Sequence, residues 1–153
     1  MFTDFGSERV RDEVLLIARI LLALLFLIFG WSKLTDYSGT VAYMTQDGLP
    51  LPSVAALVAI LIEFFGAIGL ILGVWTRPLA VLFGLYTLAT AFIGHPYWTL
   101  PDPAARYGNM INFYKNVSIL GGFLLLYITG AGRYSVDARL GLADAPPPRS
   151  SAL

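Results

Sequence analysis

The sequence predicts an all-α integral membrane protein, a four-helix bundle with a short interfacial helix between its first two spans. Hydrophobic residues make up 57% of the 153 residues and charged residues only 13%, and the mean hydropathy is +0.71. The hydrophobic residues gather in four runs, each near the ~20 residues that cross a bilayer. The runs lack the two-residue alternation of strands, and helices satisfy their own backbone hydrogen bonds in lipid.

This composition also excludes several kinds of site. The chain has no cysteine, so it holds no disulfide, thiolate metal site or iron–sulfur cluster of its own. Its one histidine cannot form a multi-histidine metal site. The formal net charge is zero, so the chain has no excess of basic residues that would indicate nucleic-acid binding. We therefore expect neither a metal nor a nucleic-acid partner.

The first predicted span covers about residues 14–34, and its only charges are Arg19 and Lys33. The polar stretch before it and the absence of an Ala-x-Ala exit after it predict a retained span, not a cleaved signal peptide.

Residues 36–52 connect this span to the next. Ser38 is a candidate N-cap of a short helix that Gly48 would end, with Val41 and Met44 on one side. We expect this helix to lie on the membrane surface.

The second and third spans are predicted at about residues 53–75 and 79–94. Glu63 is the only charge in the second, and the third has none. Only residues 76–78 separate them, and Pro78 suits a first helical turn. The two spans therefore form an antiparallel hairpin.

The third span must end near His95, because Pro96 disfavours helix at the residue before it. Residues 99–107 contain two prolines and are predicted to be a loop. The fourth span covers about residues 111–130, with Lys115 near its start.

One domain, residues 1–142, is expected to hold all four spans. The Pro- and Ser-rich residues 143–153 are predicted to be a disordered tail. Basic residues are unequally divided between the two ends of the spans, and their excess predicts that both termini are cytoplasmic. The richer end holds Arg9, Arg11, Arg77, Arg133, Arg139 and Arg149, and the other end holds Lys33, Arg106 and Lys115.

Glu63 is the most informative residue of the sequence. Counting ~1.5 Å per residue places it near the mid-plane of the bilayer, where an ionised side chain costs at least ~2.5 kcal/mol. Its side chain is too short to reach the surface, and an unpaired carboxylate there would take up a proton. We expect a basic partner, and Lys115 is the nearest cation in depth, with Arg19 further away.

The other polar residues have structural alternatives. The side chains of Lys33 and Lys115 are long enough to reach the membrane surface, so a structural role and a functional role both stay open for them. For Arg19 the structural interpretation is favoured. His95 has an interfacial interpretation, because it lies at a helix end.

Three spans each carry one face of small and polar residues, and small residues let helices approach closely. The simplest bundle turns these faces inward and forms a cationic cavity, which would favour an anion or a quinone carbonyl. The candidate catalytic residues are Glu63 and His95, and the candidate ligand-binding residues are Lys33, Lys115, Asn116 and Arg19. The faces are Arg19, Ala23, Phe26, Gly30 and Lys33; Ala56, Ala59, Glu63, Gly66 and Ala67; and Asn112, Lys115, Ser118 and Gly122, with Asn116 beside them.

Five short motifs, in this order and spacing, resemble the DoxX family of four-span membrane proteins over about residues 15–140. They are residues 29–34 (FGWSKL), 63–67 (EFFGA), 72–77 (LGVWTR), 112–116 (NFYKN) and 132–135 (GRYS).

This resemblance implies a four-helix membrane bundle in the plasma membrane of a prokaryote. It also implies a link to respiratory and sulfur redox chemistry, including a subunit like that of a thiosulfate:quinone oxidoreductase, or to oxidative-stress complexes with soluble enzymes. No covalent cofactor is implied, and quinone contact would lie near Lys33, Glu63, His95 and Lys115.

Three functions compete at this point, and the sequence leaves open whether the chain is an enzyme. The first is a membrane subunit of a quinone-linked oxidoreductase system. The second is a non-catalytic membrane anchor or scaffold for a partner enzyme. The third is a small carrier of an anion or weak acid, which is less favoured because no inverted repeat is visible. Beyond the lipid bilayer, a protein partner or a homo-oligomer is expected.

Overall fold

The computed structural model describes the backbone of residues 4–142 and the side chains of residues 10–142. Over this range all regular structure is helical, and four helical stretches are long and apolar enough to cross a membrane. The predicted all-α membrane fold is thereby confirmed, whereas the predicted disordered tail lies outside the described residues. The four stretches are Val10–Thr35, Pro52–Leu72, Thr76–Thr99 and Pro103–Thr129.

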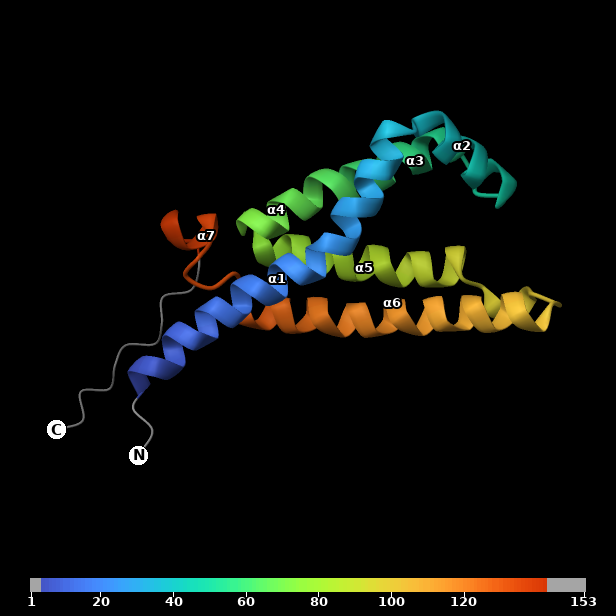
Figure 1. The fold of residues 1–153 in the computed structure, drawn as a ribbon. Coiled ribbons are helices and arrows are strands. Elements are labelled where there is room, and N and C mark those ends of the chain that lie inside the picture. The colour runs from blue at the N-terminus through green and yellow to red at the C-terminus, as the bar shows by residue number, and fades with distance from the viewer. Residues whose placement is uncertain (1–3, 143–153) are drawn as a thin grey trace.

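The first span is α1 (Asp4–Thr35), and α2 (Tyr37–Gln46) follows it almost at once. Figure 1 shows α2 folding back over the start of α3. Ser38 was the predicted N-cap, and this was wrong: the cap is Asp36, whose carboxylate accepts a hydrogen bond from Gly39 N at 2.9 Å. The aspartate is placed one residue before the first helical turn, where its oxygen reaches the unpaired backbone N–H groups.

The second span contains three successive helical segments, α3 (Pro52–Ile60), the π-helical η1 (Leu61–Gly66) and α4 (Ala67–Leu72). Glu63 lies in η1 and is buried. The small-residue face predicted around it is also largely buried, including Ala56, Ala59 and Ala67. A π-helical segment inside an α-helix is rare and is often found at functional sites.

The third span follows a tight turn. α4 ends at Gly73, whose φ of +70° is the left-handed conformation that glycine adopts without strain. α5 (Thr76–Gly94) begins after Trp75, which also has a positive φ, of +47°. His95 is the C-cap of α5, at the end expected from the following proline, and the short 3₁₀ helix η2 (Tyr97–Thr99) comes next.

The fourth span is α6 (Pro103–Thr129), and a short helix, α7 (Val136–Arg139), follows it. The loop predicted at 99–107 was wrong for its last five residues, which are helical. Asp102 caps α6 by accepting from Ala105 N at 2.7 Å, and Pro103 occupies the first turn, where a missing N–H costs nothing. The second of the two prolines therefore starts a helix.

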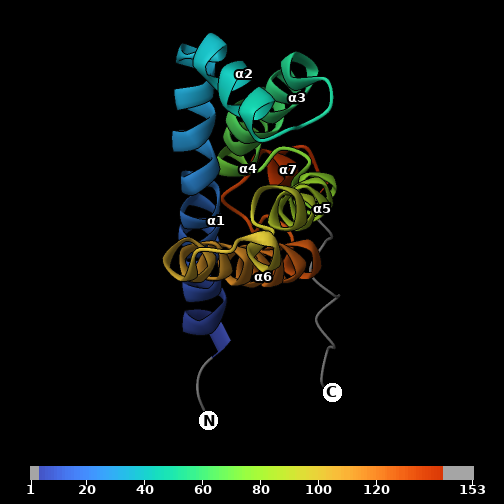
Figure 2. The same cartoon turned by 90° about the vertical axis from the view of Figure 1, so that its right-hand side faces the viewer.

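Helices α5 and α6 form an antiparallel pair, and α1 runs across this pair beside the second span (Figures 1 and 2). Three phenylalanines join these layers at the centre. Phe26 of α1 has its ring centroid 4.9 Å from that of Phe83 of α5 and 5.6 Å from that of Phe123 of α6, and the last two are 5.3 Å apart. Such aromatic contacts stabilise beyond the apolar area they bury.

The face of α6 that was predicted to point inward was wrong in part. Lys115 and Ser118 are exposed, and the buried residues of α6 are Asn116, Phe123 and Leu126. The physical reason is helix rotation: Asn116 is the residue that faces inward at this level, and the preceding Lys115 lies about 100° from it around the helix.

In the middle of α1, Arg19 is almost fully buried, with 1% of its surface exposed. Its guanidinium donates to the backbone carbonyls of Ala131, of Ile71 at 3.1 Å and of Tyr134 at 2.7 Å. One side chain of α1 thereby ties together the end of α4 and the segment after α6. Arg19 does not extend to the membrane surface, as its length alone would allow.

Asp137 of α7 completes this end of the molecule. Its carboxylate accepts hydrogen bonds from Trp75 N and Thr76 N, both at 2.8 Å. The backbone N–H groups at the start of α5, which have no partners within the helix, are satisfied in this way. We call Arg19 and Asp137, with the backbone groups they bind, the Arg19 node.

Replacing Arg19 with Met should lower the free energy of unfolding by about 3 kcal/mol or more, because it leaves three backbone carbonyls without their cationic donor. Denaturant titration in detergent micelles measures this loss. The matched control is Arg139→Met on the exposed side of α7, which should change stability by less than about 0.5 kcal/mol. Equal stabilities of the two variants would contradict the node.

Candidate functional site

Three polar side chains from three different helical segments meet inside the bundle. Lys33 of α1 donates from Nζ to Oε2 of Glu63 at 2.6 Å, and Tyr86 of α5 donates from Oη to Oε1 at 2.5 Å. We call these residues the Glu63 cluster. Each carboxylate oxygen has a donor, and the cation neutralises the charge, which is what an ionised acid needs at mid-span.

The members of the Glu63 cluster differ in accessibility. Glu63 is buried, with 7% of its surface exposed, whereas the Lys33 side chain is 24% exposed. The Lys33 ammonium has three N–H donors, and it also lies over the Phe29 ring, 5.7 Å from the centroid. The cluster can therefore offer N–H donors from Lys33 to a small polar group while Glu63 stays shielded.

Gly30 explains how α1 comes close enough to make the ion pair. A Cβ on Gly30 would lie 2.5 Å from Phe64 N and 2.7 Å from the carbonyl carbon of Glu63. Any side chain there would collide with the backbone of η1, which cannot move aside as a flexible side chain can. The glycine, three residues before Lys33, is thus a geometric condition of the salt bridge.

An open apolar groove lies on the outer side of α1 and the second span. It begins one residue after Glu63, at Phe64, and reaches Trp31, two residues before Lys33. Its lining offers no charge and fits a hydrocarbon chain. The lining residues are Leu27, Ile28, Trp31, Phe64 and Ile68.

The structure brings Lys33 to Glu63 and separates the other candidate cations from it. The expectation that Lys115 is the partner nearest to Glu63 was wrong: Lys115 is exposed and donates to Asn112 Oδ1 at 2.9 Å. Arg19 lies in its own node, where backbone carbonyls occupy its guanidinium. The depth of a residue in its span does not determine which way its helix is rotated.

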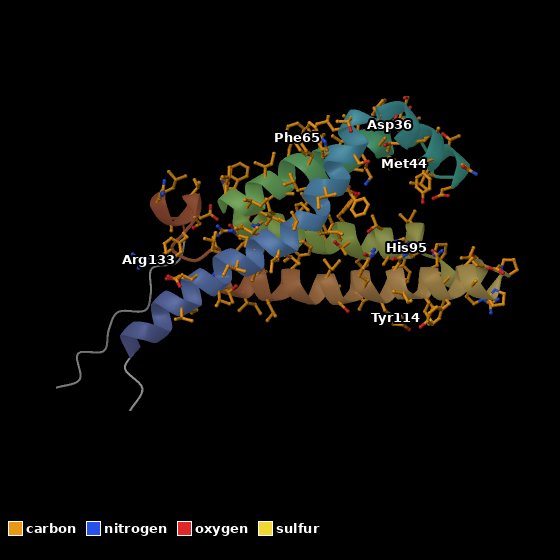
Figure 3. All side chains as sticks on the ribbon, viewed as in Figure 1. Asp36, Met44, Phe65, His95, Tyr114 and Arg133 are labelled. Carbon is orange, nitrogen blue, oxygen red and sulfur yellow. The ribbon has the colours of Figure 1, made fainter. Side chains whose placement is uncertain are left out.

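His95 and Asn116 lie along the α5–α6 pair and not in the Glu63 cluster. His95 Nδ1 is 3.3 Å from Asn109 Oδ1, and Asn116 Nδ2 donates to Thr90 Oγ1 at 3.5 Å. Figure 3 places His95 at the end of α5, with Tyr114 below it on α6 and Arg133 at the opposite end of the molecule. The predicted roles of His95 in catalysis and of Asn116 in ligand binding stay predictions.

Tyr86 is the member of the cluster that the sequence analysis missed. The third span has no charged residue, so it lacked the signal that marked candidate residues in the other spans. One signal was present: a tyrosine in the middle of a span carries a hydroxyl that needs a hydrogen-bond partner. In lipid the nearest source of such a partner is another helix.

The comparisons with known proteins agree with this architecture. The sequence model of the DoxX family matches residues 14–96, which include all three residues of the Glu63 cluster. No solved structure matches the chain significantly.

Three curated proteins illustrate the similarity. Inner membrane protein YphA of Escherichia coli is 53% identical over 138 residues, which cover 90% of this chain and 96% of the relative. Inner membrane protein YqjF of the same species is 42% identical, covering 87% and 96%. The ER-derived vesicles protein ERV29 of Saccharomyces cerevisiae is 26% identical, covering 87% of this chain and 36% of the relative.

Replacing Gly30 with Ala should destabilise the protein by about 1–3 kcal/mol, because the added methyl group forces α1 away from η1. Gly121→Ala is the matched control, since a Cβ at Gly121 meets nothing within 4 Å. It should be neutral or stabilising by up to about 1 kcal/mol, because it removes backbone freedom in a helix. Unfolding titrations of both variants in micelles measure the difference, and equal effects would refute the close approach.

Proposed function

Because this chain belongs to the DoxX family, we propose that it is the integral membrane subunit of a quinone-linked oxidoreductase system. The system acts on a sulfur oxyanion or in oxidative-stress defence. The observation that supports this proposal is the Glu63 cluster, a compact group of proton donors and acceptors at mid-span beside an apolar groove.

The residues of the cluster fit a quinone. Lys33 can turn an N–H donor toward a carbonyl oxygen of the head group, since part of its side chain is accessible. The groove from Phe64 to Trp31 would take the hydrocarbon tail. An amphipathic ligand with a polar head and a long apolar chain matches this combination better than a free anion does.

The reaction requires protons as well as electrons. A quinone becomes a quinol when it takes up two electrons and two protons. Two thiosulfate ions supply the two electrons when a new S–S bond joins them as tetrathionate, and a partner protein would carry this oxidation. Glu63 would deliver protons to the head group and recover them from water, a role of general acid and base.

An anchor or scaffold subunit is the alternative function. It is favoured by the fact that both carboxylate oxygens of Glu63 already have donors within the chain, as a purely structural brace would. The Arg19 node, which holds the segment after α6 on the bundle, would then present a docking surface for the partner enzyme.

Substitutions in the cluster separate these functions. Glu63→Gln should lower the kcat of quinone reduction at least about 100-fold, the lower range for loss of a general acid or base. Lys33→Met should raise the KM for quinone, and Tyr86→Phe should lower kcat. Membranes that contain the complete system, supplied with thiosulfate and a water-soluble quinone, provide the assay.

Tyr127→Phe is the matched control, because Tyr127 is exposed on α6, and it should keep the full rate. If all three cluster variants accumulate normally and keep the full rate, the redox proposal fails and the anchor function stands.

We also propose that the protein lies in the inner membrane with both termini in the cytoplasm. Its two E. coli relatives are named inner membrane proteins, and the end of the bundle that holds Arg77 and Arg133 is the more basic one.

The absence of cysteine allows a clean test of this orientation. A membrane-impermeant maleimide should label Thr99→Cys in spheroplasts and Arg139→Cys only after the membrane is opened. Both positions are exposed. The reverse labelling pattern would overturn the orientation.

A further inference from the structure

Polar side chains continue from the Glu63 cluster along the α5–α6 pair toward His95. α6 carries three asparagines, Asn109, Asn112 and Asn116, at spacings of three and four residues, which places them on one face of the helix. Polar side chains at such positions in a span are expensive and are usually retained for function.

Two contacts join this asparagine face to α5. Near the end of α5, His95 Nδ1 is 3.3 Å from Asn109 Oδ1. Deeper in the bundle, Asn116 donates to the hydroxyl of Thr90 at 3.5 Å. Asn116 is buried, with 9% of its surface exposed, so its amide cannot exchange hydrogen bonds with bulk water.

Thr90 and Tyr86 lie one turn apart on α5, a rise of about 6 Å. The Thr90 hydroxyl accepts from Asn116 and donates to the backbone carbonyl of Thr87 at 3.0 Å. Thr87 lies between Tyr86 and Thr90 on the same turn; it is 1% exposed, and its Oγ1 has no hydrogen-bond partner among the described residues. This stretch of the α5 surface is thus rich in hydroxyl groups, and Tyr86 at its inner end donates to Glu63.

We propose that this series of side chains, the polar track, conducts protons between the aqueous surface at the His95 end of α5 and the Glu63 carboxylate. The inference rests on the proposed function, because it takes Glu63 as the group that exchanges protons. The polar track consists of His95, Asn109, Asn116, Thr90 and Tyr86.

The transfer moves one proton along a relay of hydroxyl groups and water molecules. Tyr86 releases its hydroxyl proton to Oε1 of Glu63 and accepts a proton from the water on its other side. A proton enters that water chain at His95, so one proton leaves the aqueous phase and one O–H bond forms on Glu63. The asparagine amides and the Thr90 hydroxyl hold the waters in line and are positioning residues.

Lys33 is the other titratable group in contact with Glu63, and it provides the competing route. Its side chain is partly exposed, so a proton could reach Glu63 past α1 without using α5 or α6. The test must therefore separate a path through the α5–α6 pair from one beside Lys33.

The rate at which Glu63 becomes protonated after an acid jump separates the two routes. Rapid-mixing infrared spectroscopy on the purified protein follows the carbonyl band of the protonated carboxyl, which is assigned by its absence in Glu63→Gln. Asn116→Leu and the nearly isosteric Thr90→Val should each slow the appearance of this band at least about tenfold. Thr129→Val, in the exposed part of α6, should keep the original rate.

An unchanged rate in both Asn116→Leu and Thr90→Val would overturn the polar track and leave the Lys33 side as the route. The proposed function fails in a different way, by normal quinone turnover in Glu63→Gln. Slow protonation in the two track variants, together with normal turnover in Glu63→Gln, would sustain the track as a proton path and reject the redox role.

Discussion

The Glu63–Lys33 ion pair is the constraint on which the centre of the bundle depends. A carboxylate at mid-span is shielded from water, so neighbouring helices must supply a cation and a hydrogen-bond donor. Lys33 and Tyr86 do so from two other spans, and Gly30 removes the side chain that would keep α1 away. Such a pair adds little net stability over an apolar core, but losing one partner is costly, so it restricts how the helices can pack.

Helix α1 carries both polar centres of the molecule. Arg19 and Lys33 are fourteen residues apart, about 21 Å along the helix. Arg19 binds backbone carbonyls and is therefore insensitive to the side chains around it, whereas Lys33 binds one specific acid. Arg19 thereby joins distant segments of the chain, whereas Lys33 helps to form the Glu63 cluster. The phenylalanine contacts between the two centres hold α1 against α5 and α6.

The same features can serve structure and chemistry together. Glu63 braces three helical segments, and it is buried near the middle of its span, whereas the buried Asp12 lies near the start of the first span. Its position in a π-helical segment, beside a groove open to lipid, gives an amphipathic ligand a way to approach. In the proposed polar track, hydroxyl and amide groups of α5 and α6 connect this buried position to the aqueous surface. A redox role and an anchoring role differ in whether that connection is used.

Four membrane helices and a buried Glu63 could be predicted from the sequence, because hydropathy and the spacing of small residues are local properties of the chain. The sequence also indicated His95 as the end of a span, through the proline that follows. Which residues meet is a property of the folded bundle. Lys33 and not Lys115 neutralises Glu63, and Tyr86 completes the cluster, because helix rotation and interhelical distance depend on packing between distant segments, which no single run of sequence encodes.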